Sequence, residues 1–169
     1  ERGKYFLERF ISAYSIMLAF KGIPAVYFNS IFGTANDNSK YIISGNKRDL
    51  NRYRWNKNRL EKSLKNKNSK QSIYYQNMTY LLNIRKKQKA FHPYASQETL
   101  NLGSKIFAIK RVSIDKKQSI FCLTNVSSKK QFVNLSKEKI IGKNLLKKKM
   151  IFVNKNLELE PFQTVWISN

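Results

Sequence analysis

Apolar residues recur at helical spacing near the start of the chain. Within residues 4–20, a helix of 3.6 residues per turn would place Phe6, Phe10, Tyr14, Met17 and Leu18 near one face. Other apolar residues surround that face, and a Lys-Gly pair follows. The pattern predicts a well-buried helix that ends at this pair.

The next segments predict the tail of an α/β array. Residues 23–28, Ile-Pro-Ala-Val-Tyr-Phe, have the pattern of a short interior strand of a parallel sheet. Residues 29–55 are polar, and a long loop without secondary structure of its own is often functional. Residues 56–66 predict a short exposed helix. Residues 70–89 predict a clear helix with Tyr74, Met78, Leu81, Leu82 and Arg85 on one side.

After residue 92 the pattern changes to short segments rich in β-branched and aromatic residues, separated by turns of Gly, Ser, Asn and Lys. The segments are 98–103, 105–112, 119–126, 131–136, 149–154, 156–160 and 164–169. Such spacing predicts an antiparallel module, a small sandwich or curled sheet. Because a proline disfavours helix at the residue before it, His92-Pro93 marks the expected boundary. We therefore expect an α/β part over residues 1–92 and an all-β domain over residues 93–169.

Composition adds a strong positive charge to this picture. Hydrophobic residues make up 41% of the chain, which is typical of a globular protein, and the formal net charge is +23. Such a charge can indicate a nucleic-acid partner, since lysine and arginine displace counterions from phosphates. Here the charge is mostly lysine spread along the whole chain, with little aromatic interleaving. We expect no nucleic-acid partner, and keep a basic nucleic-acid-binding module as an alternative.

Several features of the sequence bear on the cellular compartment of the protein and on whether the chain is part of a longer one. Cys122 is the only cysteine, so no disulfide forms within the chain, which suits a reducing compartment, and we expect the cytoplasm. No segment has the length of a membrane helix or the pattern of a signal peptide. The chain enters a helix directly and has no initial methionine, which is typical of the middle of a longer protein. The sequence does not indicate an oligomeric state.

The sequence contains no complete catalytic arrangement. Sugar-transferring enzymes need a pair of carboxylates across the scissile bond, and the region after the first helix offers only Asp37, Asp49 and Glu61, none at the end of the strand. The single histidine, His92, stands beside a proline and is interpreted as structural. No cluster of metal ligands and no phosphate-binding glycine loop is present, so we expect no metal and no cofactor.

The best binding candidate is the polar loop, where Arg48, Arg52 and Arg54 lie near two aromatic residues, Tyr53 and Trp55. Arginine offers a planar fork suited to phosphate or carboxylate, and aromatic rings stack on sugar faces. The alternative is that these arginines form a solvated face, or pair with the loop's two aspartates and fix its shape. The residues alone leave both interpretations open.

The chain resembles a known family from end to end. The run GIPAVYF, followed by GTAND and KRDLNRYRW, resembles the eighth strand and following loop of the sucrose phosphorylase-like branch of the α-amylase superfamily, glycoside hydrolase family 13. The segments LLNIRKKQKAFHPYASQETLNLGSKIFAIKR, QSIFCLTNVS and LELEPFQTVWISN resemble the last barrel helix and C-terminal β domain of that branch. The run AFHPYASQETLNLG looks closer to glucosylglycerate phosphorylases within it.

The resemblance implies the end of a (β/α)8 barrel followed by a small β-sandwich domain. It implies a retaining glycoside phosphorylase that transfers glucose from sucrose or a glucosylglycerate-like α-glucoside to inorganic phosphate and gives α-glucose 1-phosphate. The family's three catalytic carboxylates lie on earlier strands, so none is expected here and the chain alone should be inactive. A non-catalytic truncated remnant is the other alternative.

The resemblance also assigns substrate-binding residues. It places Arg48 in the acceptor site and Asn51, Arg52 and Asp37 around the same pocket. The chain departs from the commonest pattern of the family by a lysine where glycine precedes Arg48 and by Tyr53 where histidine follows Arg52. These departures leave the identity of the acceptor open.

Overall fold

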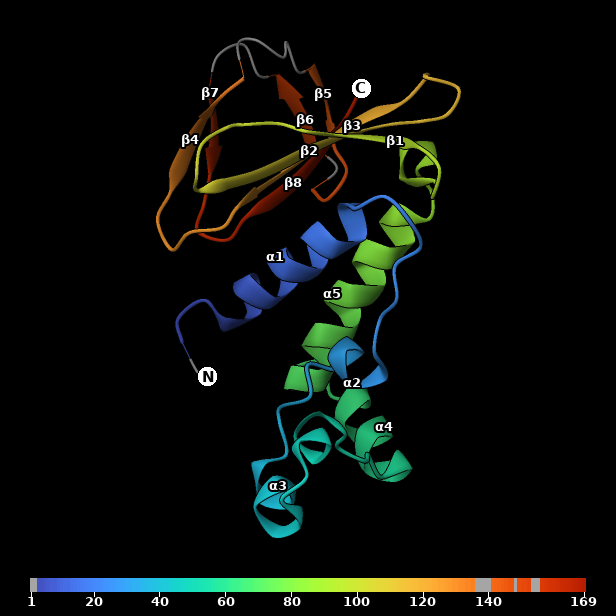
Figure 1. Cartoon of the computed structure of the whole chain (residues 1–169), viewed down its shortest axis with the longest axis vertical. Coiled ribbons are helices and arrows are strands. Elements are labelled where there is room, and N and C mark those ends of the chain that lie inside the picture. Colours follow the sequence, from blue (N-terminus) through green and yellow to red (C-terminus); the bar gives the residue numbers. More distant parts are fainter. Residues whose placement is uncertain (1–2, 136–140, 148, 153–155) are drawn as a thin grey trace. The chain divides into compact units, whose positions relative to one another are not determined.

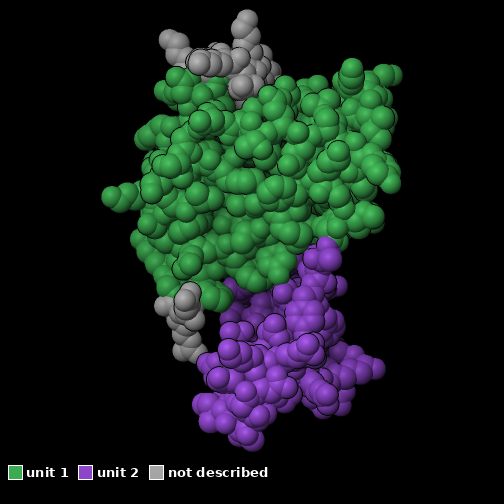
Figure 2. Space-filling view, in the orientation of Figure 1, with its two compact units in different colours: residues 1–24, 81–169 green, residues 25–80 purple. Residues whose placement is uncertain are grey.

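The computed structural model describes residues 3–135, 141–147, 149–152 and 156–169, which form two compact units. Unit 1 comprises residues 1–24 and 81–169, and unit 2 comprises residues 25–80, coloured green and purple in Figure 2. The grouping joins the first helix to the C-terminal strands. The predicted division of the native protein at residue 92 falls inside unit 1 and stays a prediction.

The helices occupy the first half of the chain (Figure 1). Their bounds are α1 Phe6–Ala19, α2 Phe28–Ile31, α3 Asn38–Ser44, α4 Lys57–Lys65 and α5 Lys70–Arg85, with 3₁₀ turns η1 Lys47–Asn51 and η2 Lys89–Phe91. The three predicted helices are confirmed as α1, α4 and α5. In α5 the predicted side is buried at Tyr74, Met78, Leu81 and Arg85.

The strands follow, and the pairings between them in the described part of the chain are antiparallel. Their bounds are β1 Ser96–Thr99, β2 Ile106–Val112, β3 Ser119–Asn125, β4 Gln131–Asn134, β5 Ile141–Asn144, β6 Lys149–Phe152, β7 Asn156–Leu159 and β8 Thr164–Ser168. One sheet has the order β1-β2-β3-β8-β5-β6 and the other pairs β4 with β7. All seven predicted segments contain a strand, although residues 136, 153 and 154 lie outside the described residues. Strand β5 was not predicted.

The six-stranded sheet is covered on both faces, which explains its nearly continuous apolar strands. Successive side chains of a strand point to opposite faces. Phe121 and Leu123 of β3 join the core shared with β4 and β7, whereas Ile120 and Cys122 pack with the end of α1, the end of α5 and η2. Trp166 of β8 is fully buried in this second core. The predicted sandwich is therefore completed by helices on the outer face of its larger sheet.

Two expectations for the first part of the chain are wrong. Residues 23–27 form no strand, and Ile23 is 84% exposed. A strand needs a neighbour for its backbone hydrogen bonds, and the described residues contain no strand beside this run. The predicted long loop is also not devoid of secondary structure, because α2, α3 and η1 lie within it.

The burial predicted for α1 is confirmed only at its end, where Leu18 is buried and Met17 packs against the core. Its buried residues are Ser12, Ser15, Leu18 and Ala19, whereas Phe6 is 36% exposed. Small side chains allow the helix to approach the sheet closely. The aromatic side chains that the periodicity assigned to the core stay at least partly accessible.

Candidate substrate-binding loop

The loop of unit 2 is built from two short helical segments with explicit start and stop residues. Asp37 caps α3, its carboxylate accepting the Lys40 N–H at 3.0 Å. Gly45, with φ of 64°, ends α3 in the left-handed conformation that glycine adopts without strain. Asn46 then caps η1 by accepting the Arg48 N–H at 3.0 Å. The turn that carries Arg48 therefore has a defined start.

A buried asparagine holds the far end of this turn. Asn29 of α2 is 6% exposed, and its side-chain amide donates to the carbonyls of Asn51 at 3.3 Å and Tyr53 at 3.0 Å. Its Oδ1 is buried and has no partner among the described residues. The amide thereby ties α2 to the chain on both sides of Arg52. The sequence analysis missed this residue.

The two aspartates of the loop are engaged by a lysine and its helix, not by arginines. Lys40 Nζ lies 2.6 Å from Asp49 Oδ1, and this hydrogen bond is the main cause that lowers the pKa of Asp49. Asp37 is occupied as the cap of α3. The alternative in which arginines pair with these aspartates is therefore not what the structure shows.

The four predicted binding residues lie on one short stretch of unit 2. The Asp37 N–H donates to the carbonyl of Leu50 at 2.7 Å, which brings the start of α3 beside η1. Arg48, Asn51 and Arg52 are exposed. Within the described parts of the chain, neither Arg48 nor Arg52 forms an ion pair. Their guanidinium groups are available to an anion.

Aromatic residues follow directly and line a hollow. The rings of Tyr53 and Trp55 meet edge to face, with centroids 5.0 Å apart, and the Trp55 indole N–H donates to Thr34 Oγ1 at 3.0 Å. Together with residues 34–39 and Gln71 they line an open cleft of about 400 Å³, the 34–39 cleft. Asp37 is the one predicted binding residue in its wall.

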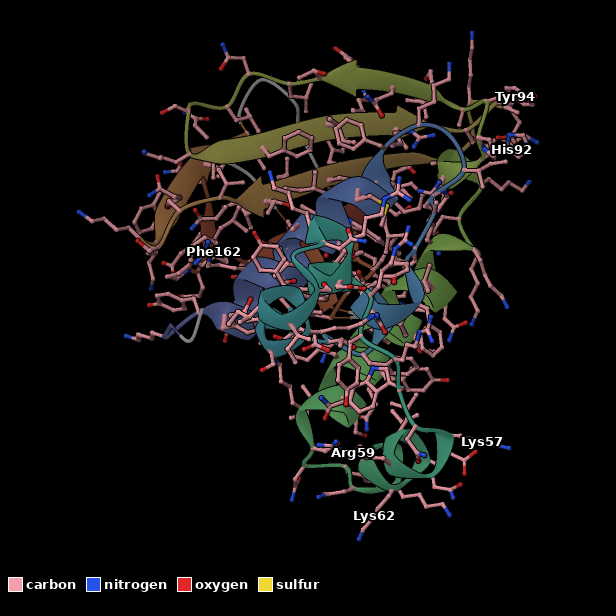
Figure 3. All side chains as sticks on the ribbon, turned by 60° about the horizontal axis from the view of Figure 1, so that its bottom comes forward. Lys57, Arg59, Lys62, His92, Tyr94 and Phe162 are labelled. Atoms are coloured by element: carbon pink, nitrogen blue, oxygen red, sulfur yellow. The ribbon has the colours of Figure 1, made fainter. Side chains whose placement is uncertain are left out.

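The remaining candidate groups have structural surroundings. His92 Nδ1 accepts the Tyr94 N–H at 3.2 Å, and both side chains lie at the surface (Figure 3). Cys122 is buried, and burial raises the pKa of its thiol, so it is no ready nucleophile. Among the described residues there is no group of side chains that could hold a metal ion. No helix within them is long and apolar enough to cross a membrane.

No family model matches the chain. Comparison with curated proteins, however, finds glucosylglycerate phosphorylases as relatives. The chain is 34% identical over 161 residues to the glucosylglycerate phosphorylase of Allomeiothermus silvanus, covering 95% of this chain and 27% of that protein. It is 30% identical over 162 residues to the glucosylglycerate phosphorylase of Escherichia coli, covering 94% of this chain and 28% of that protein. The chain thus spans little more than a quarter of the length of these relatives.

Solved structures share the fold at low sequence identity. The trehalulose synthase MutB, crystallised as a mutant with glucose, superposes with a TM-score of 0.73 at 14% identity, covering 99% of this chain and 39% of that one. AmyP in complex with maltose superposes with a TM-score of 0.70 at 14% identity, covering 98% of this chain and 35% of that one. The mixture of helices and antiparallel sheets described above therefore matches about a third of each of these proteins.

Proposed function

The chain is homologous to the C-terminal region of the glucosylglycerate phosphorylases of the α-amylase superfamily, and we propose that it is the acceptor-side portion of a retaining glycoside phosphorylase. In this proposal residues 1–92 are the end of a (β/α)8 barrel and residues 93–169 its C-terminal β domain. Active sites of such barrels lie in the loops after the strands, where the loop of unit 2 would stand.

The reaction would be a double displacement. An α-glucoside such as glucosylglycerate or sucrose would transfer its glucosyl group to an enzyme carboxylate, and inorganic phosphate would then take it as α-glucose 1-phosphate. The acids of unit 2 have other roles: Asp37 caps a helix, Asp49 pairs with Lys40, and Glu61 lies 4.0 Å from Lys57. In the family that the chain resembles, the catalytic carboxylates lie on earlier barrel strands, so they would come from outside this chain, which alone should be inactive.

One observation carries the assignment of the loop. Asp49 pairs with Lys40 and Asp37 caps α3, which leaves Arg48 and Arg52 exposed without an ion pair in the described chain. A phosphorylase must favour an anionic acceptor over water, and an arginine fork is a direct physical means. We assign acceptor binding to Arg48, with Asn51, Arg52 and Asp37 shaping the same pocket.

The first test is the mass of the endogenous protein, detected with an antibody against its last residues. A species of roughly the relatives' length would be assayed for phosphate-dependent release of glucose 1-phosphate from glucosylglycerate and from sucrose. A species no longer than this chain, inactive in that assay, would favour the truncated remnant over the enzyme.

The role of Arg48 is tested in the active species. Arg48→Ala should reduce phosphorolysis far more than hydrolysis of the glucosyl-enzyme, because water does not need a cationic partner. Arg59→Ala, an exposed arginine on α4 (Figure 3), is the matched control and should change neither rate. Equal loss of both rates in Arg48→Ala would contradict acceptor binding by this side chain.

A further inference from the structure

The end of α5 and the segment that follows α1 form an open pocket within unit 1, which we call the α5-end pocket. Residues 22–24, 85–89 and 91–93 line it, and its volume is about 390 Å³. Small-molecule sites have volumes of roughly 300–1,000 Å³. None of the lining residues belongs to the loop of unit 2, so the acceptor role assigned to Arg48 does not account for this pocket.

The lining of the α5-end pocket is strongly cationic. It contains no aspartate or glutamate, and its cations are Arg85, Lys86, Lys87 and Lys89. Lys89 Nζ lies 3.2 Å from a carboxylate oxygen of Asp115, whereas neither Lys86 nor Lys87 forms an ion pair within the described chain. The C-terminal end of a helix carries a partial charge of about −0.5, which is too small to offset the remaining cations. The pocket therefore has a net positive charge that no residue of its lining neutralises.

Arg85 places one of these charges inside the protein. It is 7% exposed, and its Nη2 donates to the carbonyls of Gly22 at 2.9 Å and Phe91 at 3.2 Å, two residues of the lining. Burial, and after it the charge of the buried Arg111, lowers the pKa of Arg85. The carbonyl groups satisfy the hydrogen bonds of these arginines but do not cancel their charge. An anion in the adjacent pocket would therefore be attracted by them.

His92 adds a directed hydrogen-bond donor to the lining. It lies at the surface (Figure 3), and its Nδ1 accepts the Tyr94 N–H at 3.2 Å. In a neutral imidazole whose Nδ1 is an acceptor, the other ring nitrogen carries the proton. Nε2 is therefore a donor, and it has no hydrogen-bond partner in the part of the chain that the structure describes. Oxygens of phosphate and carboxylate groups accept from such a donor.

Apolar groups of the lining favour a ligand that is more than a bare ion. Ile23 is 84% exposed, and two half-buried prolines, Pro24 and Pro93, belong to the same lining. An apolar body placed against them would gain roughly 25 cal/mol for each Å² removed from water. A hydrated inorganic anion would gain nothing from this surface.

We propose that the α5-end pocket binds a small organic anion, with its phosphate or carboxylate group on Lys86, Lys87 and His92. The apolar body of this ligand lies against Ile23 and the two prolines. All of these residues belong to unit 1, so the proposal does not rest on the proposed phosphorylase function. A chain without phosphorylase activity would still bind the anion, and a pocket that binds none would leave the assignment of Arg48 unchanged.

The test is a titration of the full chain at constant pH and ionic strength, followed by NMR. His92 is the single histidine, so its ring C–H signals need no assignment by variants. Phenyl phosphate, and separately benzoate, should shift these signals saturably at millimolar concentrations, and the tighter of the two identifies the preferred anionic group. Inorganic phosphate lacks the apolar body and benzyl alcohol lacks the charge, so each should bind at least roughly tenfold more weakly.

Two lysines of unit 1 form a matched pair of variants. Lys87 lines the pocket, whereas Lys105 lies outside the lining, and both are exposed, so neither substitution disturbs the core. Lys87→Gln should weaken the apparent affinity for phenyl phosphate roughly two- to tenfold, the effect of one hydrogen bond, and Lys105→Gln should not change it.

Two further comparisons separate the apolar wall and the loop of unit 2. Ile23→Ser should also weaken binding of phenyl phosphate, whereas Ile42→Ser, at a position of α3 that is 78% exposed, should not. Arg48→Ala should leave the titration unchanged. Shifts that do not saturate, equal affinities for phenyl phosphate and inorganic phosphate, equal effects of the two lysine variants, or loss of the shifts in Arg48→Ala would each overturn the proposal.

Discussion

Arg85 and Arg111 donate to the carbonyl oxygens of neighbouring residues in the last turn of α1. Arg85 Nη1 bonds the carbonyl of Leu18, and Arg111 Nη1 bonds the carbonyl of Ala19 at 2.7 Å. The last carbonyls of a helix have no partner within it and carry its negative dipole end. Two guanidinium groups, one from α5 and one from β2, therefore complete the end of α1 within unit 1.

The two arginines also share an aromatic neighbour. Their guanidinium carbons lie 5.2 Å and 5.8 Å from the ring centroid of Phe91. Burial is the main cause that lowers the pKa of each, and Arg111 lowers that of Arg85 further. The charges are met by backbone carbonyls rather than by carboxylates, since no ion pair within the described chain includes either arginine.

Removing Arg111 should destabilise unit 1 strongly. Its guanidinium also donates to the carbonyls of Ser96 and His92, so Arg111→Met would leave several buried acceptors unmet. We expect a loss of about 2–5 kcal/mol in the free energy of unfolding, measured with urea. Arg111→Lys should be nearly as harmful, because one ammonium cannot reach acceptors on three sides. A lysine variant as stable as the parent would refute this network.

Alanine substitutions at Gly33 and Gly45 separate the cost of backbone strain from the cost of a steric clash. Both have positive φ, 57° and 64°, but a Cβ at Gly33 would lie 2.4 Å from the Tyr74 ring, whereas nothing lies within 4 Å of one at Gly45. Gly33→Ala should therefore lower stability by about 1–3 kcal/mol more than Gly45→Ala. Equal losses, measured by urea unfolding, would mean that only backbone strain matters at Gly33.

Asn29 should determine how firmly the substrate-binding loop is held. Asn29→Ala removes the donors to Asn51 and Tyr53, so amides in residues 47–55 should exchange hydrogen faster, with a stability loss of about 1–3 kcal/mol. Asn58→Ala, at an exposed position, is the control. Unchanged exchange in residues 47–55 would show that the amide does not hold the loop.

The turn between β2 and β3 predicts an acid-sensitive contribution to stability. Hydrogen bonds from Ser113 Oγ, the Lys117 N–H and Lys89 lower the pKa of Asp115 from 3.8 to about 2. Because the folded-state pKa is depressed, this contribution is fully present above pH 3.8 and is lost as pH falls through about 2. The stability difference between the parent and Asp115→Asn should therefore shrink over that interval. In a Ser113→Ala background, which lacks the hydrogen bond that lowers the pKa of Asp115 most, the shrinkage should be smaller and should be complete at a higher pH, because the folded-state pKa then lies closer to that of the unfolded chain.

The sequence predicted the elements whose partners lie within the chain. Strands β2, β3 and β8 follow from their runs of β-branched and aromatic residues, and the buried side of α5, Arg85 included, follows from helical periodicity. The strand predicted over residues 23–28 was wrong, because an apolar run forms a strand only where a neighbouring strand can pair with it. Strand β5 has little apolar pattern. A glycine within a strand can mark a close approach of another backbone. Gly142 is such a case, since a Cβ there would lie 2.1 Å from the Ser168 carbonyl oxygen.

The sequence suggested which residues bind the substrate, and their role stays a prediction, but it did not indicate the contacts that hold the loop in place. Asp37 as a helix cap and Gly45 as a helix end are readable signals that predict α3. Asn29 gave none, because the carbonyls it binds are 22 and 24 residues away along the chain. The pairing of Asp49 with Lys40 could not be predicted either. The sequence contains many lysines and arginines, and it does not show which of them lies near Asp49.

The domain boundary can be tested by limited proteolysis. Cleavage within residues 25–80 should leave α1 bound non-covalently to residues 81–169, because Leu18 and Ala19 pack with Ile120 and Trp166 on the outer face of the sheet. Both pieces should then elute together in size exclusion and separate only in denaturant. If a fragment of about residues 95–169 persists alone with native-like fluorescence of Trp166, the β domain is independent and the boundary predicted near residue 92 holds. That outcome would also mean that α1 and Arg85 add stability to a sheet that folds without them.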